Sequence, residues 1–403
     1  MRSLLCLLLL WAVPARAQID PEKRRLIEAG GDKGFSGPDP TAGYIFYYIN
    51  EPRFVKPEYT LRLALAPVYL DSELGIQRKG GNSYGIGLAG GFIADGYTEI
   101  RRGHYFKEES FNGNGGTVSF SHYHELGELP YGIPVSGVAR VFMHLATYAH
   151  SKKTQDDFTL PPDHREYAAR LGVRLGGIPP ELKPNRAGEF SLWYVPFLRD
   201  EFGPYGFNGD RRLNRMPQLY WTRLAFAYRK KNFDRYEFSV QAGDSTDADR
   251  ISGYRLGGML PFSSEFPLAL AGYYNGELTA DRYVLFGARY STALNDIPTW
   301  YWSGFAQSAN VHFLEGLDQA RPWNSAVGTG VRYLTKDGYL TVSLDFGYGI
   351  DALRSGRRGA ESAALTAELD LMALSRKVRP KTRPHVQPTK RQGGYWLGQL
   401  FTP

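Results

Sequence analysis

The chain has 403 residues, and its 48 Lys and Arg outnumber its 41 Asp and Glu, which gives a formal net charge of +7. Aromatic residues make up 14% of it and glycines number 46, a composition that suits short strands, tight turns and interfacial aromatic side chains. The single cysteine, Cys6, excludes disulfides and thiolate metal sites within the chain. Beyond residue 17 no apolar run approaches the ~18 residues of a transmembrane helix, so membrane insertion would require a β-barrel.

Residues 1–17 have the pattern of a secretory signal peptide. Arg2 supplies a positive charge, residues 4–13 are apolar, and Ala15-Arg16-Ala17 is a typical cleavage site. We therefore expect export and a mature chain that begins at Gln18 without a thiol. An uncleaved anchor is less favoured, because the apolar run is shorter than the ~20 residues that span a bilayer.

Residues 18–42 read as a short polar lead. Residues 21–28 are compatible with a helix of one or two turns, and glycine- and proline-rich chain continues to Pro40. This lead is too short for a folded periplasmic domain. Residues 43–374 then predict a single domain with an all-β fold.

Alternation of apolar with polar or small residues marks the strands of this domain. In residues 59–65, for example, apolar side chains alternate with Thr60, Arg62 and Ala64, as expected for a strand between lipid and a wet lumen. Segments rich in glycine and asparagine at 80–82 and 112–116 predict turns. The pattern therefore predicts a transmembrane antiparallel β-barrel, and an even number of strands returns the chain to its starting side.

Sixteen strands are predicted, at 43–49, 58–70, 83–97, 101–111, 116–124, 133–149, 165–178, 188–199, 217–230, 232–244, 251–262, 281–291, 301–314, 325–335, 339–350 and 361–373. We expect 361–373 to close the barrel. The alternative closing strand is the short aromatic element at 393–401.

Residues 375–403 form a basic, proline-rich tail. Seven cations lie between Arg376 and Arg391 with no acid among them, so the tail should be extended and solvated. It either contacts anionic lipid head groups or an acidic partner, or only keeps itself soluble; the second interpretation is favoured.

The segment from Arg255 to Tyr290 predicts a strand, a re-entering loop and a second strand. Gly257 and Gly258 end the first strand, and the loop carries Ala271-Gly272-Tyr273. This order resembles the loop of BamA/TamA-type outer-membrane barrels, the bacterial surface antigen family. Residues 301–311 and 325–349 are similar to later strands of that family, so the resemblance covers about 251–373. An ordinary extracellular hairpin of an unrelated barrel is the alternative.

The resemblance implies a sixteen-stranded barrel with an inward-folding loop, similar also to the C-terminal barrel of patatin-like outer-membrane proteins, here without periplasmic repeats. In the family, an arginine of the loop pairs with an acid on a neighbouring strand. Ala271 stands at the arginine position, and the expected acid falls near Gln307 and Asn310, which are uncharged. Loss of both charges together is coherent, because removal of one would leave the other buried and unpaired. The absence of this ion pair weakens the inference that the protein has an insertion activity.

Enzymatic and metal chemistry find little support. The nearest run to a G-x-S-x-G elbow, residues 34–38, lacks the last glycine, which excludes a patatin-type lipase, and no catalytic residue or cofactor is predicted. His122 and His124 share one side of a strand and form a candidate metal pair, but no third ligand is evident, and polar residues lining the lumen are the favoured explanation.

Two charged loops are further candidate sites. The acidic loop 244–249 lacks the spacing of a calcium loop and reads as a solvated turn. Arg211, Arg212 and Arg215 could contact lipopolysaccharide phosphates if their loop is extracellular.

These observations predict an integral outer-membrane barrel that assists protein or lipid insertion or translocation, in an accessory role. Outer-membrane lipid, lipopolysaccharide and other assembly components are the expected partners, and nucleic acid is not. The alternatives are a passive pore or structural barrel without assembly activity and, less favoured, a barrel enzyme acting on lipids.

Overall fold

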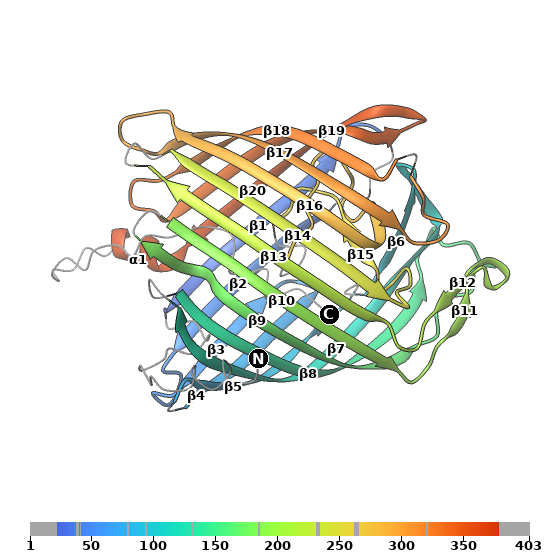
Figure 1. Cartoon of the computed structure of the whole chain (residues 1–403), viewed down its shortest axis with the longest axis horizontal. Coiled ribbons are helices and arrows are strands. Elements are labelled where there is room, and N and C mark those ends of the chain that lie inside the picture. The colour runs from blue at the N-terminus through green and yellow to red at the C-terminus, as the bar shows by residue number, and fades with distance from the viewer. Residues whose placement is uncertain are drawn as a thin grey trace, which may run out of the picture.

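The computed structural model describes residues 22–378, apart from 38–39, 41, 79, 93–94, 130–132, 184–185, 231–233, 262–265 and 320. Sixteen antiparallel strands close into one barrel (Figure 1). They are β1 (Arg24–Gly34), β2 (Ala42–Pro52), β3 (Tyr59–Leu65), β4 (Tyr69–Gln77), β5 (Asn82–Gly91), β7 (His104–Leu129), β8 (Ile133–His150), β9 (His164–Lys183), β10 (Arg186–Arg199), β13 (Gln218–Arg229), β14 (Arg235–Thr246), β16 (Leu278–Ala293), β17 (Trp300–Phe313), β18 (Trp323–Leu334), β19 (Leu340–Arg354) and β20 (Arg357–Asp370).

The barrel closes between its first and last strands. β1 and β20 pair antiparallel over nine residues each, from Leu26 opposite Asp370 to Gly34 opposite Ser362. We call this junction the seam. The predicted all-β fold with sixteen strands, and the closing strand near 361–373, are therefore confirmed. The alternative closing strand at 393–401 and the basic tail beyond residue 378 lie outside the described residues.

The two faces of the wall differ in chemistry. Large apolar side chains on the outer face are solvent-exposed in the isolated protein, and they include Ile86, Leu88, Val118, Phe120, Val141, Met143, Leu145, Leu344, Phe346, Tyr348 and Ile350. The inner face carries buried polar and charged side chains, among them Glu28, Glu73, Arg170, Arg174, Glu189 and Arg223. A strand with an apolar outer and a polar inner side is what lipid outside and a lumen inside require.

An aromatic pair lies on the outer face toward each end of the barrel, as in aromatic belts. Trp300 and Tyr333 lie in contact near one end of the barrel, with ring centroids 4.9 Å apart. Tyr194 and Tyr220 stack at the same distance toward the other end. Such belts are typical of the two membrane interfaces.

The two ends of the barrel are unequal. At one end the barrel strands are joined by at most six residues, and here also lie the start of β1 and α1 (Leu371–Val378). At the other end long connections carry β6 (Tyr97–Arg101), the separate hairpin of β11 (Gly203–Tyr205) and β12 (Arg211–Leu213), and β15 (Tyr254–Leu256) (Figure 1). Because outer-membrane barrels have short periplasmic turns and longer extracellular loops, we assign the first end to the periplasm.

The helix α1 directly follows the last strand. Asp370 caps its N-terminus, since one carboxylate oxygen accepts hydrogen bonds from the N–H groups of Met372 and Ala373 at 2.8 and 3.0 Å. Within the described residues, no helix has the length and apolar character needed to cross a membrane.

The first strand was not predicted. Residues 21–28 are compatible with a helix of one or two turns and the predicted barrel begins at 43, whereas β1 begins at Arg24 and pairs with β2 and β20. Its Glu, Lys and Arg content favours a helix locally, but pairing on both sides outweighs that weak preference.

Four predicted strands were also wrong in their limits. The segment 58–70 contains two strands, β3 and β4, separated by a turn at 66–68. The segments 101–111 and 116–124 form one strand, β7, so the predicted turn at 112–116 does not exist. Its glycines instead leave room for Asp95, because a side chain at Gly113 or Gly115 would overlap Asp95. The segment 251–262 contributes only the short β15. The errors cancel in the total of sixteen.

Candidate functional site

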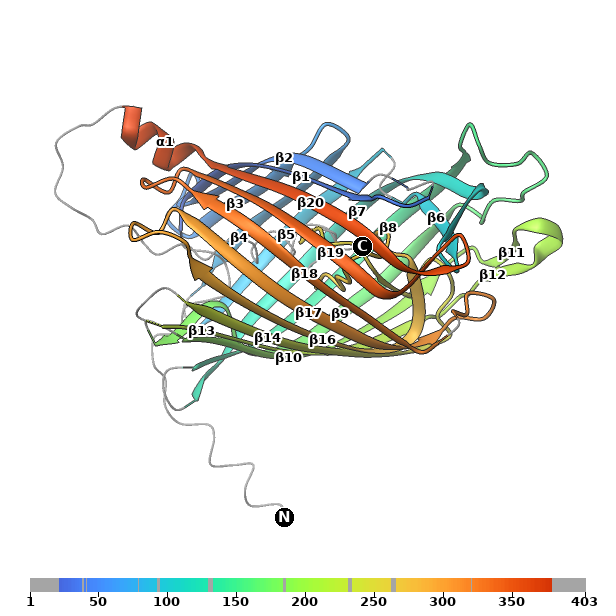
Figure 2. The same ribbon diagram turned by 90° about the horizontal axis from the view of Figure 1, so that it is seen from above.

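The loop between β15 and β16 folds into the barrel and occupies its lumen (Figure 2). We call its described residues, 257–261 and 266–277, the plug. Gly257 and Gly258 end β15 with φ angles of +132° and +76°, a region that side chains with a Cβ rarely adopt. Backbone hydrogen bonds from Gly257 to Leu268 and from Leu270 to Gly258, both 3.0 Å, then fold the plug on itself.

The tip of the plug is pressed against the wall at β19 and β20. Gly272 has a φ of +79°, and a Cβ there would overlap the backbone nitrogen of Gly349 and lie 2.5 Å from the carbonyl oxygen of Ala360. Ala271 is fully buried and faces Gly347, where an added side chain would overlap it. The small residues on both sides therefore allow backbone-to-backbone contact between plug and wall.

Three hydrogen bonds fix this tip to three strands. The Ala271 N–H donates to Gln307 Oε1 at 2.9 Å, the Gly272 N–H to Ser362 Oγ at 2.9 Å, and the Tyr273 hydroxyl to Asn324 Oδ1 at 3.2 Å. Gln307 thus contacts the plug as an uncharged partner. Asn310, the other suggested partner, lies on the opposite face of β17 from Gln307 and does not point into the lumen.

A buried ion pair holds the plug where the sequence suggested none. Arg354, at the end of β19, binds both carboxylate oxygens of Glu277 at 2.9 and 2.8 Å. Its guanidinium also donates to the Gly272 carbonyl at 2.9 Å and lies 3.7 Å from the centre of the Tyr274 ring. The side chains of Arg354 and Glu277 are 5% and 0% exposed, so removal of either charge would leave the other buried. We call this pair the lock.

The plug also reaches the first strand, across the seam. The Met259 N–H donates to Asp32 Oδ2 on β1, and the Tyr274 hydroxyl donates to the carbonyl of Ser36 just beyond it, both at 2.6 Å. Because Ser362 belongs to β20, the plug is bonded to both sides of the seam. Separation of β1 from β20 would therefore require plug contacts to break.

Across the lumen, Phe266 anchors the plug on the opposite wall. Its ring lies 5.4 Å from that of Trp193 on β10 and 6.0 Å from that of Trp221 on β13. The guanidinium groups of Arg174 and Arg223 lie 5.8 and 5.7 Å from the Phe266 ring. The plug therefore spans the lumen from one wall to the other.

The solved structures that share this architecture include CdiB from Acinetobacter baumannii, with a TM-score of 0.60, 12% identity, and coverage of 89% of this chain and 64% of that one. BamA from Haemophilus ducreyi lacking POTRA domains 1–3 gives a TM-score of 0.54 at 10% identity, and the match covers 86% of this chain and 70% of that one. CdiB from Escherichia coli gives a TM-score of 0.55 at 12% identity, and the match covers 89% of this chain and 68% of that one. This chain has the fold of the BamA/TamA-type outer-membrane barrels.

No family model and no curated protein matches the sequence. The chain spans just under two thirds of the length of the Acinetobacter CdiB chain. At these identities the likeness to BamA and CdiB is one of fold, and that fold supports a place in the outer membrane.

Against the BamA-type loop pattern, Ala271 and Gln307 are joined by a hydrogen bond in place of an ion pair. The charges that hold this plug lie elsewhere: Glu277 stands six residues after Ala271, and Arg354 lies on the β19–β20 hairpin. This pair could not be predicted from the sequence, because its members are 77 residues apart and no spacing rule links them.

A second closure lies above the plug, at the loop end. We call residues 97–111, 150–163, 199–217 and 247–251 the lid. Its core is a buried cluster of Tyr97, Phe111, Phe158, Tyr205 and Leu213. The turn after β6 extends over the barrel mouth, since Arg102 Nε donates to the carbonyl of Asp318 at 3.3 Å and Gly103 lies against the carbonyl of Leu353.

Buried ion pairs connect the segments of the lid. Glu99 is fully buried and pairs with Arg250, and with Arg101 and Arg211 at 3.6 Å each. Glu109 also pairs with Arg211. Burial lowers the pKa of Arg211 to about 10, and the Glu99 carboxylate opposes that shift. Arg211 is therefore committed to the lid and is not a surface group for lipopolysaccharide, whereas Arg212 is exposed.

The acidic loop 244–249 is likewise structural. Asp249 pairs with Arg199 at 2.5 Å and accepts hydrogen bonds from the N–H groups of Ile251 and Ser252 at 3.0 and 2.9 Å. Its oxygens are thereby used within the protein rather than for a cation.

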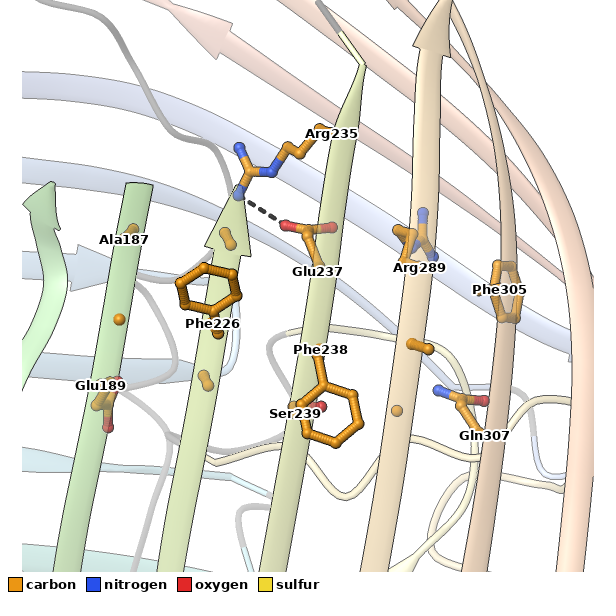
Figure 3. Close-up of a pocket in the computed structure, with 15 residues that line it drawn as sticks. Ala187, Glu189, Phe226, Arg235, Glu237, Phe238, Ser239, Arg289, Phe305 and Gln307 are labelled. Atoms are coloured by element: carbon orange, nitrogen blue, oxygen red, sulfur yellow. Dashed lines mark ion pairs between the residues drawn. The ribbon is translucent and has the colours of Figure 1, made fainter. Parts of the chain in front are cut away.

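Below the plug, the periplasmic half of the lumen contains a pocket of about 190 Å³ (Figure 3). Charged side chains on its wall include Glu189, Arg289 and the ion pair of Arg235 with Glu237 at 2.6 Å, and small residues leave the space between them. Gln307, which binds the plug, also lines the pocket. The pocket therefore shares one wall residue with the contact that holds the tip of the plug.

Proposed function

We propose that this protein assists the insertion or translocation of proteins or lipids at the outer membrane, as an accessory component of assembly. The single observation that carries the proposal is the plug bonded to β1, β20 and the β19–β20 hairpin together. In such a barrel, release of the plug and opening of the seam are coupled, which a passive pore does not need. The pocket below the plug would receive the client from the periplasm.

Depletion of the protein in its host tests the proposal. Outer-membrane proteins and lipopolysaccharide are then quantified separately in purified outer membranes. Loss of one of these classes, restored by the wild-type chain but not by a variant whose plug is cross-linked to β17, supports assembly activity and identifies the client. Unchanged levels of both would refute it.

Planar-bilayer conductance separates the competing function. Rare, fluctuating openings are expected from a barrel closed by plug and lid. A large, steady, ion-selective conductance would instead favour a passive pore.

A further inference from the structure

We propose that His122, His124 and Asn82 form a site for one divalent transition-metal ion on the outer face of the barrel, at its periplasmic rim. The expectation that the two histidines line the lumen is wrong. Tyr123, between them, faces the lumen and donates from its hydroxyl to Glu73 at 3.0 Å. Since successive side chains of a strand point to opposite faces, both histidines point outward.

Three atoms that could bind a metal ion lie close together here. His122 Nε2 lies 3.0 Å and His124 Nδ1 lies 2.9 Å from the same atom, Asn82 Oδ1. Asn82 begins β5, directly opposite His124 of β7. Both separations are hydrogen-bond distances, and ligand atoms that each bind an ion at about 2.0–2.2 Å lie only slightly farther apart, so small side-chain rotations would admit an ion. Tyr84 stacks on His122, with ring centroids 4.9 Å apart and planes at 12°, and so limits the orientations of one ligand.

The ligand set indicates the class of ion. Imidazole nitrogens suit Zn²⁺, Cu²⁺ and Ni²⁺. The amide oxygen of Asn82 would be a weaker third ligand, and water would occupy the remaining coordination positions of the ion. Among the described residues, no group of three His, Cys, Asp or Glu side chains is placed to hold a metal ion, so no site of that kind competes with this one there. A bound ion would link β5 to β7 at the rim.

Calorimetric titration of the untagged, full-length protein in detergent with Ni²⁺, and in parallel with Zn²⁺, tests the site. We expect one saturable site, weakened at least about tenfold by His122→Ala or His124→Ala. Asn82→Asp should tighten it, because a carboxylate adds charge to the same position. The control His312→Ala removes an exposed histidine paired with Asp281 and should leave affinity unchanged.

Copper bound to the wild type should show two imidazole nitrogens by electron paramagnetic resonance. Unchanged affinity in the double histidine variant, or no effect of Asn82→Asp on a folded barrel, would overturn the proposal. The Asn82 variant keeps the test valid even where histidine removal impairs assembly, because it is expected to gain affinity rather than lose it.

Discussion

The lock gives the sharpest prediction. Arg354→Met keeps an apolar stem of similar length and removes the charge, which leaves the Glu277 carboxylate buried without its arginine partner, although the Tyr274 N–H still donates to it at 2.8 Å. Breaking a buried pair in this way costs about 3–5 kcal/mol. We take the lower end of this range. At about 1.4 kcal/mol per factor of ten, release of the plug becomes at least ~100-fold more frequent.

Hydrogen exchange measures this release directly. The Ala271 and Gly272 amides are bonded to Gln307 and Ser362 and should exchange only when the plug leaves the wall. Arg354→Met should accelerate their exchange, whereas the control Arg357→Met, an exposed arginine of the same hairpin, should not.

A double-mutant cycle with Glu277→Gln isolates the pair. The double variant should be less perturbed than the sum of the single variants, because each single change strands a buried partner. Equal exchange of the plug amides in Arg354→Met and Arg357→Met would refute the reasoning.

Three further changes probe the plug, the lid and the outer face. Gly272→Ala should release the plug more than Gly338→Ala does, since both sites have positive φ but only Gly272 faces backbone, and equal amide exchange would contradict this. Glu99→Gln should accelerate proteolysis of the lid at least about tenfold relative to the exposed control Glu201→Gln, because three arginines lose the acid that they share. Equal cleavage rates in the two variants would count against this prediction. Leu344→Arg should lower the yield of barrel with heat-dependent gel mobility, because a cation facing lipid costs up to about 2–4 kcal/mol at the bilayer midplane and less toward the interfaces. An unchanged yield would argue against lipid contact at this position.

The architecture of the wall could be predicted from the sequence because lipid imposes a simple rule. In every strand that crosses the membrane, apolar side chains that face lipid, such as Val141 and Leu344, alternate with polar or small ones that face the lumen. This alternation can be recognised from the residues of a single strand. The same rule failed for β1, whose Glu28 and Asp32 face the lumen and whose glycines supply no apolar signal. Its structure comes from β2 and β20, which only the closed barrel brings to it.

The site was predictable only in part, for a related reason. Gly257, Gly258 and Gly272 mark the loop because their backbone conformations need glycine, which is a local property. The lock is not local: Arg354 meets Glu277 only after β16 to β19 have formed the wall. The same holds for Asn82, which meets His122 and His124 because β5 and β7 are neighbours. Register, rather than spacing along the chain, assembles both sites.

The plug and the lid are each held by their own buried ion pairs, and one arginine joins the two closures. Arg255 Nε donates to the carbonyl of Gly276 in the plug at 3.2 Å, and its Nη2 donates to the carbonyl of Thr98 in the lid at 2.7 Å. A continuous water path exists only while both closures are open. A client that displaces the plug from the periplasmic side would break this link, while the ion pairs of Glu99 and Glu109 still hold the lid closed at the outer surface.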